Sequence, residues 1–225
     1  MTDSPGRECA LCPRLVDFRL EARAKEPGWH NAPVPTLGPA SARLLIVGLA
    51  PGMRGANRTG RPFTGDWAGD LLYETLGDLG FTTGTYDENG EDDLQLVDTR
   101  ITNAVRCVPP QNKPTPAEIK TCRPFLDETI ATMPRLKAIV ALGRISHDSV
   151  TRALGEGPSR LPFAHGREFA LPQIAGGVTL FDSYHCSRYN TNTGVLTPQM
   201  FHAVFARVRG LLDGVSASPA PLGRR

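Results

Sequence analysis

The sequence predicts an α/β fold: a single domain with a central, mainly parallel four-stranded sheet flanked by helices. Two observations predict it. Four short apolar runs recur along the chain, and helical patterns of apolar residues lie between and after them. A chain of 225 residues with 40% hydrophobic content can bury one sizeable core. We therefore expect one domain over residues 1–215, followed by a disordered tail over residues 216–225, which is rich in Ser, Ala and Pro.

The four expected strands are residues 43–48, 101–105, 138–142 and 178–181. Their near-continuous apolar composition is typical of parallel strands that are buried on both faces. The first run ends at Gly48, which indicates a strand that leads directly into a loop.

Two segments have helical periodicity. The apolar residues that share one helical face are Trp67, Leu71, Leu72, Leu76 and Leu79 in the first segment, and Phe201, Val204, Phe205, Val208 and Leu211 in the second. Helix starts are marked by Thr115-Pro116-Ala117-Glu118, which has the order of a capping box, and by Thr197-Pro198. Ligands of such folds bind at the carboxyl ends of the strands, so we expect the site in the loops after the first, second and fourth strands.

The formal net charge is only +2 and the pI about 8.3, so any surface for nucleic acid must be local. Arg54, Arg58 and Arg61 lie in one Gly-rich stretch. A second stretch is acidic and holds Asp87, Glu88, Glu91, Asp92, Asp93 and Asp98. We expect the acidic stretch to face away from phosphates; the simpler alternative is that both stretches are solvated loops.

The N-terminal residues lack the apolar core of a signal peptide, and no segment has the roughly 18 apolar residues of a membrane span. These features predict a cytoplasmic protein without a membrane partner. In a reducing compartment, five cysteines are not expected to form disulfides, and closely spaced cysteines point first to metal or redox chemistry.

Four of the cysteines form two pairs. Cys9 and Cys12 make a CxxC that precedes every expected strand, which does not suit a thioredoxin-like redox pair, and Cys107 and Cys122 enclose 14 residues. Four thiolates suit a structural zinc or a cubane iron–sulfur cluster, but the zinc ribbon pattern has two close pairs. The spacing favours the cluster over zinc, with buried inert cysteines as a third reading. Cys186 stands apart.

The Gly-rich stretch after the first strand has neither the Gly-Lys-Ser/Thr of a P-loop nor the GxGxxG of a dinucleotide fold. Its glycines still allow backbone amides to approach a phosphate, and its arginines supply positive charge. A mobile surface loop is the alternative.

Four motifs occur in order along the chain: Gly48-Leu49-Ala50-Pro51-Gly52, then Gly60-Arg61-Pro62-Phe63-Thr64-Gly65-Asp66, then Thr102-Asn103-Ala104-Val105-Arg106-Cys107 with Pro109-Pro110, and finally Tyr184-His185-Cys186-Ser187 leading to Asn190. Together with the four paired cysteines they resemble the family 5 (type B) uracil-DNA glycosylases. The resemblance runs from Cys9 to about residue 212; the acidic stretch and the tail fall outside it.

The resemblance implies the uracil-DNA glycosylase fold and an enzyme that flips uracil, or another deaminated base, out of DNA and hydrolyses its N-glycosidic bond to leave an abasic site. It implies a four-iron four-sulfur cluster held by Cys9, Cys12, Cys107 and Cys122. The expected partner is DNA that contains uracil or other deaminated bases, and we expect a monomer.

Residue by residue, the resemblance implies that Phe63 stacks on the flipped base, Asn103 reads its edge and Asp66 positions the attacking water. His185 would lie against the leaving base. The implied base-binding residues also include Gly48 and Ala50, and the implied DNA-binding residues are Gly52, Arg54, Arg58, Ser187, Arg188, Tyr189 and Asn190, with Tyr189 as a wedge in the vacated stack.

Each role has a structural alternative. Phe63 can be a core residue, Asn103 a strand-end cap, Asp66 the N-cap of the following helix and His185 a satisfied internal histidine. One side chain at position 66 can serve both as cap and as catalytic carboxylate.

Two positions depart from the superfamily pattern. Sister families carry a polar or acidic residue in the first motif where this chain has Leu49 and Ala50, which predicts a pocket that accepts several bases. Cys186 stands where the last motif often has proline, so a rigid turn residue next to His185 is missing.

Two other classes of protein share some of these features. An iron–sulfur electron carrier needs no pocket carboxylate or stacking ring, and a non-catalytic iron–sulfur nucleic-acid-binding protein needs no competent Asp66 and His185. Because the chain holds all of these groups, the sequence favours the glycosylase.

Overall fold

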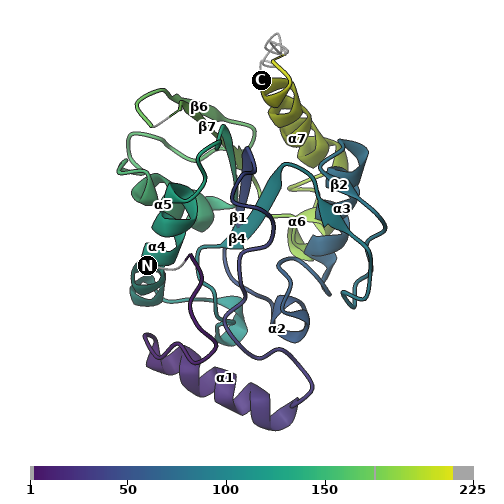
Figure 1. Cartoon of the computed structure of the whole chain (residues 1–225), viewed down its shortest axis with the longest axis vertical. Coiled ribbons are helices and arrows are strands. Elements are labelled where there is room, and N and C mark those ends of the chain that lie inside the picture. The colour runs from purple at the N-terminus through teal and green to yellow at the C-terminus, as the bar shows by residue number, and fades with distance from the viewer. Residues whose placement is uncertain (1–2, 175, 215–225) are drawn as a thin grey trace.

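The central sheet has five strands in the order β4-β1-β5-β7-β6. They are β1 (Leu44–Gly48), β4 (Thr99–Asn103), β5 (Ala138–Leu142), β7 (Val178–Ser183) and β6 (Glu168–Leu171). The computed structural model describes residues 3–174 and 176–214, so the predicted tail lies outside the described residues (Figure 1).

The four predicted strands are present and pair in parallel, and the predicted number of strands is wrong by one. The additional strand, β6, lies at the edge and pairs antiparallel with β7. Only Leu171 of β6 is buried, and the apolar run in this strand, Phe169-Ala170-Leu171, is shorter than the four or more residues from which a sequence pattern identifies a buried strand. The second strand begins at Thr99 and ends at Asn103, because buried Thr99 and Arg100 join the sheet although they are polar.

Helices cover both faces of the sheet (Figure 1). One face packs against α3 (Trp67–Asp78) and α7 (Pro198–Leu212), whose buried residues include Leu72 and Phe205. The opposite face packs against α4 (Pro116–Ala131) and α5 (Arg144–Ala153), through residues such as Leu126 and Val150. The sheet is therefore buried on both sides, as its apolar strands predict.

The predicted helix starts are confirmed. Thr115 and Glu118 form the reciprocal hydrogen bonds of a capping box at the start of α4, and Thr197 caps α7. The predicted inner face of α7 is wrong at its end, because Leu211 is exposed and Leu212 is buried. Position 212 lies four residues after Val208, which is the spacing that returns a side chain to the same face.

The N-terminal helix α1 (Pro13–Lys25) lies across one end of the molecule, and its Leu15 packs against Val105, Cys122 and Phe125 (Figure 1). The remaining elements are short: α2 (Ala56–Thr59), β2 (Thr82–Thr83), β3 (Gln95–Leu96), the 3-10 helix η1 (Pro110–Asn112) and α6 (Arg188–Asn192). Among the described residues, no helix combines the length and the apolar character that crossing a membrane requires.

Candidate active site

A cavity of about 640 Å³ opens at the carboxyl ends of β1, β4 and β7. The loops that follow these strands line it and contribute Phe63, Asp66, Asn103 and His185. The cavity therefore lies at the three loops in which the site is predicted, and the roles of these residues stay predictions. The volume falls within the roughly 300–1,000 Å³ typical of pockets for small molecules.

Gly48, the last residue of β1, lets two of these side chains come together. A Cβ at position 48 would lie 2.6 Å from Cζ of Phe63 and would also collide with Oδ1 of Asn103. The absence of a side chain at Gly48 therefore sets the close approach of the ring and the amide at the end of the strand.

Asn103 ends β4 with its side chain almost fully buried against the cavity, 4% exposed. Within residues 3–174 and 176–214 its amide makes no hydrogen bond, so the reading as a strand-end cap is wrong. The amide atoms are not among the enclosed polar atoms without a partner, so they face the open cavity. The N–H and C=O groups of the Asn103 side chain are therefore available to a ligand in the cavity.

Phe63 is buried and is both a core residue and a wall of the cavity. Its backbone has φ of 54°, a conformation that bulky residues rarely adopt. The Phe63 ring lies 6.1 Å from the ring of His185, with an angle of 30° between the planes. The two rings thus form one aromatic side of the cavity.

Asp66 is the N-cap of α3, as one of its two readings predicts, because Oδ1 accepts a hydrogen bond of 3.2 Å from the amide of Gly69. Its second oxygen, Oδ2, lies against the Gly-rich loop, 3.0 Å from where a Cβ of Gly52 would stand. Burial raises the pKa of Asp66, and hydrogen bonds from the amides of Gly69 and Ala68 oppose that rise. The carboxylate therefore caps the helix and also lines the cavity.

His185 follows β7, and the reading as a satisfied internal histidine is wrong. In the part of the chain that the structure describes, neither ring nitrogen has a hydrogen-bond partner, although the backbone carbonyl of His185 accepts from Asn190 at 2.8 Å. Burial lowers the pKa of His185 to about 4, so its imidazole is neutral at neutral pH.

The residues predicted to contact DNA fall into two groups. Gly52, Arg54, Ser187 and Arg188 line the cavity together with the base-pocket residue Ala50, and the Tyr189 side chain next to them is 74% exposed. These positions suit contact with DNA.

Two other predicted DNA contacts have protein partners. Arg58 donates to the carbonyl of Glu88 at 3.1 Å and to Oδ1 of Asn89 at 3.0 Å, and the Asn190 side chain holds the backbone of His185. Their predicted roles at DNA stay predictions. In the structure, Arg58 binds the acidic stretch and Asn190 binds the backbone next to the cavity.

The acidic stretch and the Gly-rich loop are joined by an ion pair, so the alternative that both are merely solvated loops is wrong at this contact, while the orientation of the acidic stretch relative to phosphates stays a prediction. Both guanidinium Nη atoms of Arg61 bind the carboxylate of Asp92 at 2.6 Å, and the Asp92 side chain is only 4% exposed. The acidic stretch therefore packs against the arginines instead of standing apart in solvent. The sequence could not show this, because the two residues are 31 positions apart.

Among the residues of the cavity wall that were not predicted as site residues, two have side chains that can contact a ligand through an aromatic ring or an amide. Trp67 begins α3 and was assigned to the buried helical face, but it is 44% exposed at the cavity, with the guanidinium of Arg188 5.4 Å from its ring centroid. Asn112, in the loop after β4, reaches the same cavity with φ of 57°. Its position depends on a left-handed backbone conformation that the sequence pattern does not predict.

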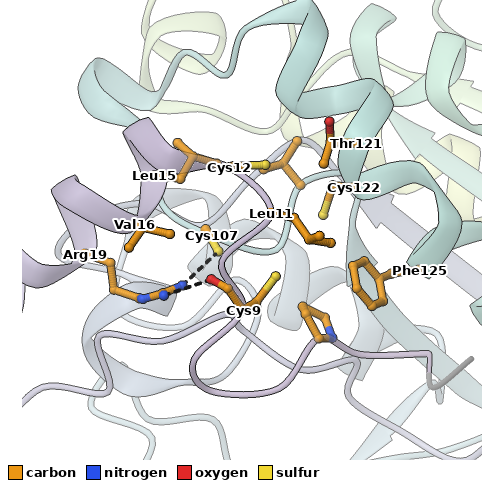
Figure 2. Close-up of a pocket in the computed structure, with 12 residues that line it drawn as sticks. Cys9, Leu11, Cys12, Leu15, Val16, Arg19, Cys107, Thr121, Cys122 and Phe125 are labelled. Atoms are coloured by element: carbon orange, nitrogen blue, oxygen red, sulfur yellow. Dashed lines mark hydrogen bonds between the residues drawn. The ribbon is translucent and has the colours of Figure 1, made fainter.

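The four paired cysteines line a second, smaller cavity between α1, the loop after β4 and α4 (Figure 2). Cys9 and Cys12 come from the N-terminal segment, and Cys107 and Cys122 come from the other side. The buried Cys186 is not part of this cavity; its Sγ donates to the carbonyl of Ala68. The separation of four cysteines from the fifth agrees with the prediction.

Two buried arginines lie beside the four sulfurs. Arg19, 2% exposed, donates to Cys107 Sγ at 3.6 Å and to the carbonyl of Cys9 (Figure 2). Arg106, 1% exposed, contributes its backbone amide to Cys122 Sγ at 3.4 Å. The Nε atoms of both arginines lack a hydrogen-bond partner among the described residues. Positive charge and unpaired N–H groups around sulfur suit a group with thiolate ligands.

As free thiols, Cys107 and Cys122 resist ionisation. Burial raises the pKa of Cys107 to about 12 and that of Cys122 to about 11. Within the described ranges, no set of three or more His, Cys, Asp or Glu side chains is arranged to hold a single metal ion. The donor set is thus four thiols around a cavity, with cations beside it, and the chemistry of these donors fits a larger group.

Comparison with known proteins places these features in a family. Residues 35–209 match the model of the uracil DNA glycosylase superfamily. The chain is 44% identical to the type-5 uracil-DNA glycosylase of Thermus thermophilus over 90% of its own length and 93% of that protein. It is 44% identical to the type-5 enzyme of Mycobacterium leprae, covering 90% of this chain and 91% of that protein. The type-4 uracil-DNA glycosylase of Sulfurisphaera tokodaii is 32% identical over 87% of this chain and 78% of its own. The chain therefore belongs to the uracil-DNA glycosylase superfamily, within its type-5 family.

Proposed function

We propose that this protein is a DNA repair glycosylase that flips uracil out of DNA and hydrolyses the N-glycosidic bond, leaving an abasic site. One observation carries the proposal: Phe63, Asp66, Asn103 and His185 meet in one cavity, and the Asn103 amide and His185 ring have no hydrogen-bond partner among the described residues. The names of the type-5 relatives support it.

Extrusion of the base is the first step of the proposed reaction, because water cannot reach the sugar carbon inside a duplex. It costs a few kcal/mol, least for a mismatched base such as U opposite G. Arg54, Ser187 and Arg188 at the rim of the cavity would hold the backbone, and the exposed Tyr189 would fill the vacated stack.

Inside the cavity, the Phe63 ring offers a stacking surface and the Asn103 amide offers one donor group and one acceptor to the edge of the base. A pyrimidine with alternating carbonyl and N–H groups, such as uracil, matches this pair. Because Leu49 and Ala50 line the wall with apolar groups, we also propose that the pocket accepts further deaminated bases.

Bond cleavage creates positive charge on the sugar and negative charge on the departing base. The Asp66 carboxylate would stabilise the first charge and position water, and its hydrogen bonds from two backbone amides favour the ionised form that this needs. His185, neutral because its pKa is near 4, would donate a hydrogen bond to the leaving base without acting as a strong acid.

We also propose that Cys9, Cys12, Cys107 and Cys122 hold a four-iron four-sulfur cluster. The four cysteines share one cavity with the buried cation Arg19, and the backbone amide of Arg106 donates to Cys122 Sγ, so both would offset the negative charge of thiolate ligands. When bound, the cluster would tie the N-terminal segment to the loop and helix after β4. Hydrolysis needs no electron transfer, so the proposed role is structural.

The test of the activity is incubation of the pure protein with a duplex that has one uracil, followed by alkali cleavage at abasic sites. We expect strand cleavage at the uracil, and none in the matched duplex with thymine. Because binding to DNA weakens as salt rises, the assay covers low to physiological salt. No abasic product at any salt concentration would instead support a DNA-binding protein without chemistry.

A panel of duplexes with uracil, hypoxanthine and modified uracils measures the range of bases. Release of uracil alone would show a narrower pocket than the apolar wall predicts.

Iron, sulfide and zinc analysis of aerobically purified protein tests the cluster: we expect iron, sulfide and a broad absorbance at about 400 nm, as for cysteine-ligated clusters. A colourless protein with one zinc would refute it, and light scattering checks the predicted monomer.

A further inference from the structure

The acidic arm, which we define as residues 84–94 between β2 and β3, lies against the loop that holds the base-stacking ring (Figure 1). Its main contact is the bidentate pair between Asp92 of the arm and Arg61 of the loop, with both Nη–Oδ distances 2.6 Å. The exposed fractions of the two side chains are 4% and 15%. A bidentate pair with this little exposure is screened weakly by water and has a fixed geometry.

Arg61 also lies beside a stacked pair of aromatic rings. Tyr73 of α3 and Tyr86 of the arm stack with centroids 4.6 Å apart, and the Arg61 guanidinium carbon is 5.6 Å from each centroid. The Tyr73 hydroxyl donates to the carbonyl of Pro62 at 2.8 Å, directly before Phe63. Arm, helix and loop thus converge on the two residues that precede the ring.

The backbone at Phe63 needs such support. Its positive φ disfavours a bulky residue, and strained conformations persist only where the surrounding structure holds them. On the side of α3, Gly69 leaves room for the Phe63 carbonyl, which a Cβ at position 69 would strike. On the other side, Arg61 Nε donates to Thr64 Oγ1 at 2.7 Å, so Arg61 spans the strained residue.

We infer that Asp92 is a positioning residue for Phe63: by fixing Arg61, it holds the loop of residues 60–66 in the conformation that presents the ring to the cavity. The inference rests on the proposed function of Phe63, and Asp92 itself does not line the cavity. It gives a role to the acidic arm, which the family motifs leave unexplained. Since Arg61 holds the pKa of Asp92 down at about 2, the pair stays ionised throughout the working pH range.

The test compares two isosteric variants within the arm. Asp92→Asn removes the charge that binds Arg61, whereas Asp93→Asn changes a carboxylate whose Oδ1 accepts from Thr85 inside the arm, at 2.8 Å. In single-turnover excision of uracil with saturating protein, Asp92→Asn should be about 10- to 100-fold slower, because small misplacements of a positioning group cost this much. Asp93→Asn should stay within about twofold of the parent.

A double-mutant cycle separates action through Phe63 from general damage. If Asp92 acts through the ring, Phe63→Ala with Asp92→Asn should be no slower than Phe63→Ala alone. Fully additive losses would overturn the inference. Should Asp92→Asn fail to fold, Arg61→Lys takes its place, because lysine keeps the charge but loses the bidentate and stacking geometry.

Amide hydrogen exchange supplies a readout that needs no activity. Residues 60–66 should exchange at least about tenfold faster in Asp92→Asn than in Asp93→Asn, while exchange in β1 and β5 stays the same. If residues 60–66 exchange at the same rate in Asp92→Asn as in Asp93→Asn, the inference is contradicted, even when the protein is active. If the parent protein does not excise uracil, the proposed function is contradicted. The exchange data would still decide whether the acidic arm holds the loop of residues 60–66.

Discussion

The two cavities of this protein differ in the sign of the charge that they are built to meet. The cavity at the strand ends holds the Asp66 carboxylate and a neutral imidazole, His185, in its interior, and its arginines, Arg54 and Arg188, are exposed to solvent. The cysteine cavity holds four sulfurs with Arg19 and Arg106 beside them. The first can stabilise a cation that forms during a reaction, and the second can stabilise a permanent anionic group. The difference shows that burial alone does not identify a functional site. The polar groups in a cavity that lack hydrogen-bond partners in the protein identify it better.

The largest effect expected in this comparison comes from removing the negative charge of the first cavity. Asp66→Asn should slow single-turnover excision by about 10²- to 10⁴-fold, the range for loss of a group that handles protons or water. Because asparagine also caps helices well, the melting temperature should change little. Asp70→Asn, in the same turn of α3 but outside the cavity, is the matched control. Cleavage at the parent rate would place the water elsewhere.

Removing the donor to the departing base should have the next largest effect. His185→Ala should keep its affinity for uracil-containing DNA but slow excision by about 10²- to 10³-fold, as when a hydrogen bond to developing negative charge is lost. His202→Ala, on α7 and away from the cavity, should excise at the parent rate. Equal rates for the two variants would exclude a role for His185.

The pH dependence of excision sharpens the electrostatic part of the comparison. In the proposed reaction Asp66 must be ionised to act, and burial raises its pKa, so activity should fall as pH drops through that raised value. Below it the rate should approach a loss of about tenfold per pH unit. His185, with a pKa near 4, gains a proton only in acid, so it should cause no loss between pH 7 and 9. A rate that falls as the pH is raised through neutrality would indicate that the reaction also needs a protonated group with a pKa higher than that of His185. Stopped-time assays in constant ionic strength buffers measure the profile.

The smallest effect on catalysis should come from the second cavity. Cys107→Ser should remove colour and iron and lower the melting temperature by several degrees, because a bound structural metal group stabilises only the folded chain. Protein that stays folded at low temperature should keep part of its activity. Cys186→Ser should keep both colour and iron, since Cys186 lies outside the cavity. Loss of iron from the Cys186 variant alone would show that the ligand set is misassigned.

The sequence predicts the elements whose stability is local or comes from uniform burial. The four parallel strands are apolar throughout, and the capping box at Thr115 lies within four consecutive residues, so both leave a readable pattern. β6 leaves only a run of three apolar residues, which is too short to identify a strand, and it has a single buried residue at the sheet edge. The inner side of α1 includes a buried arginine, Arg19, whose burial makes sense only beside cysteines from distant segments.

For the site, too, the sequence predicts local motifs but not contacts between distant residues. Phe63, Asp66, Asn103 and His185 stand in motifs of the family, and the structure brings all four into one cavity. The pairing of Arg61 with Asp92 was missed because charges 31 residues apart carry no sequence signal for contact. Whether a polar side chain is free or paired also depends on tertiary neighbours. The sequence therefore left open whether Asn103 and His185 were satisfied, and the structure answers this.

The position of the cysteines along the chain has a consequence for biosynthesis. All four cysteines of the smaller cavity lie within the first 122 residues, before β5, whereas His185 is made much later. Closing Cys9 and Cys12 onto Cys107 and Cys122 joins segments about 95 residues apart, which costs chain entropy that grows slowly with loop length. The proposed cluster would thus join the ends of the N-terminal half while the C-terminal strands are still being synthesised. A nascent chain arrested after α4 should then already bind iron, before the last wall of the catalytic cavity exists.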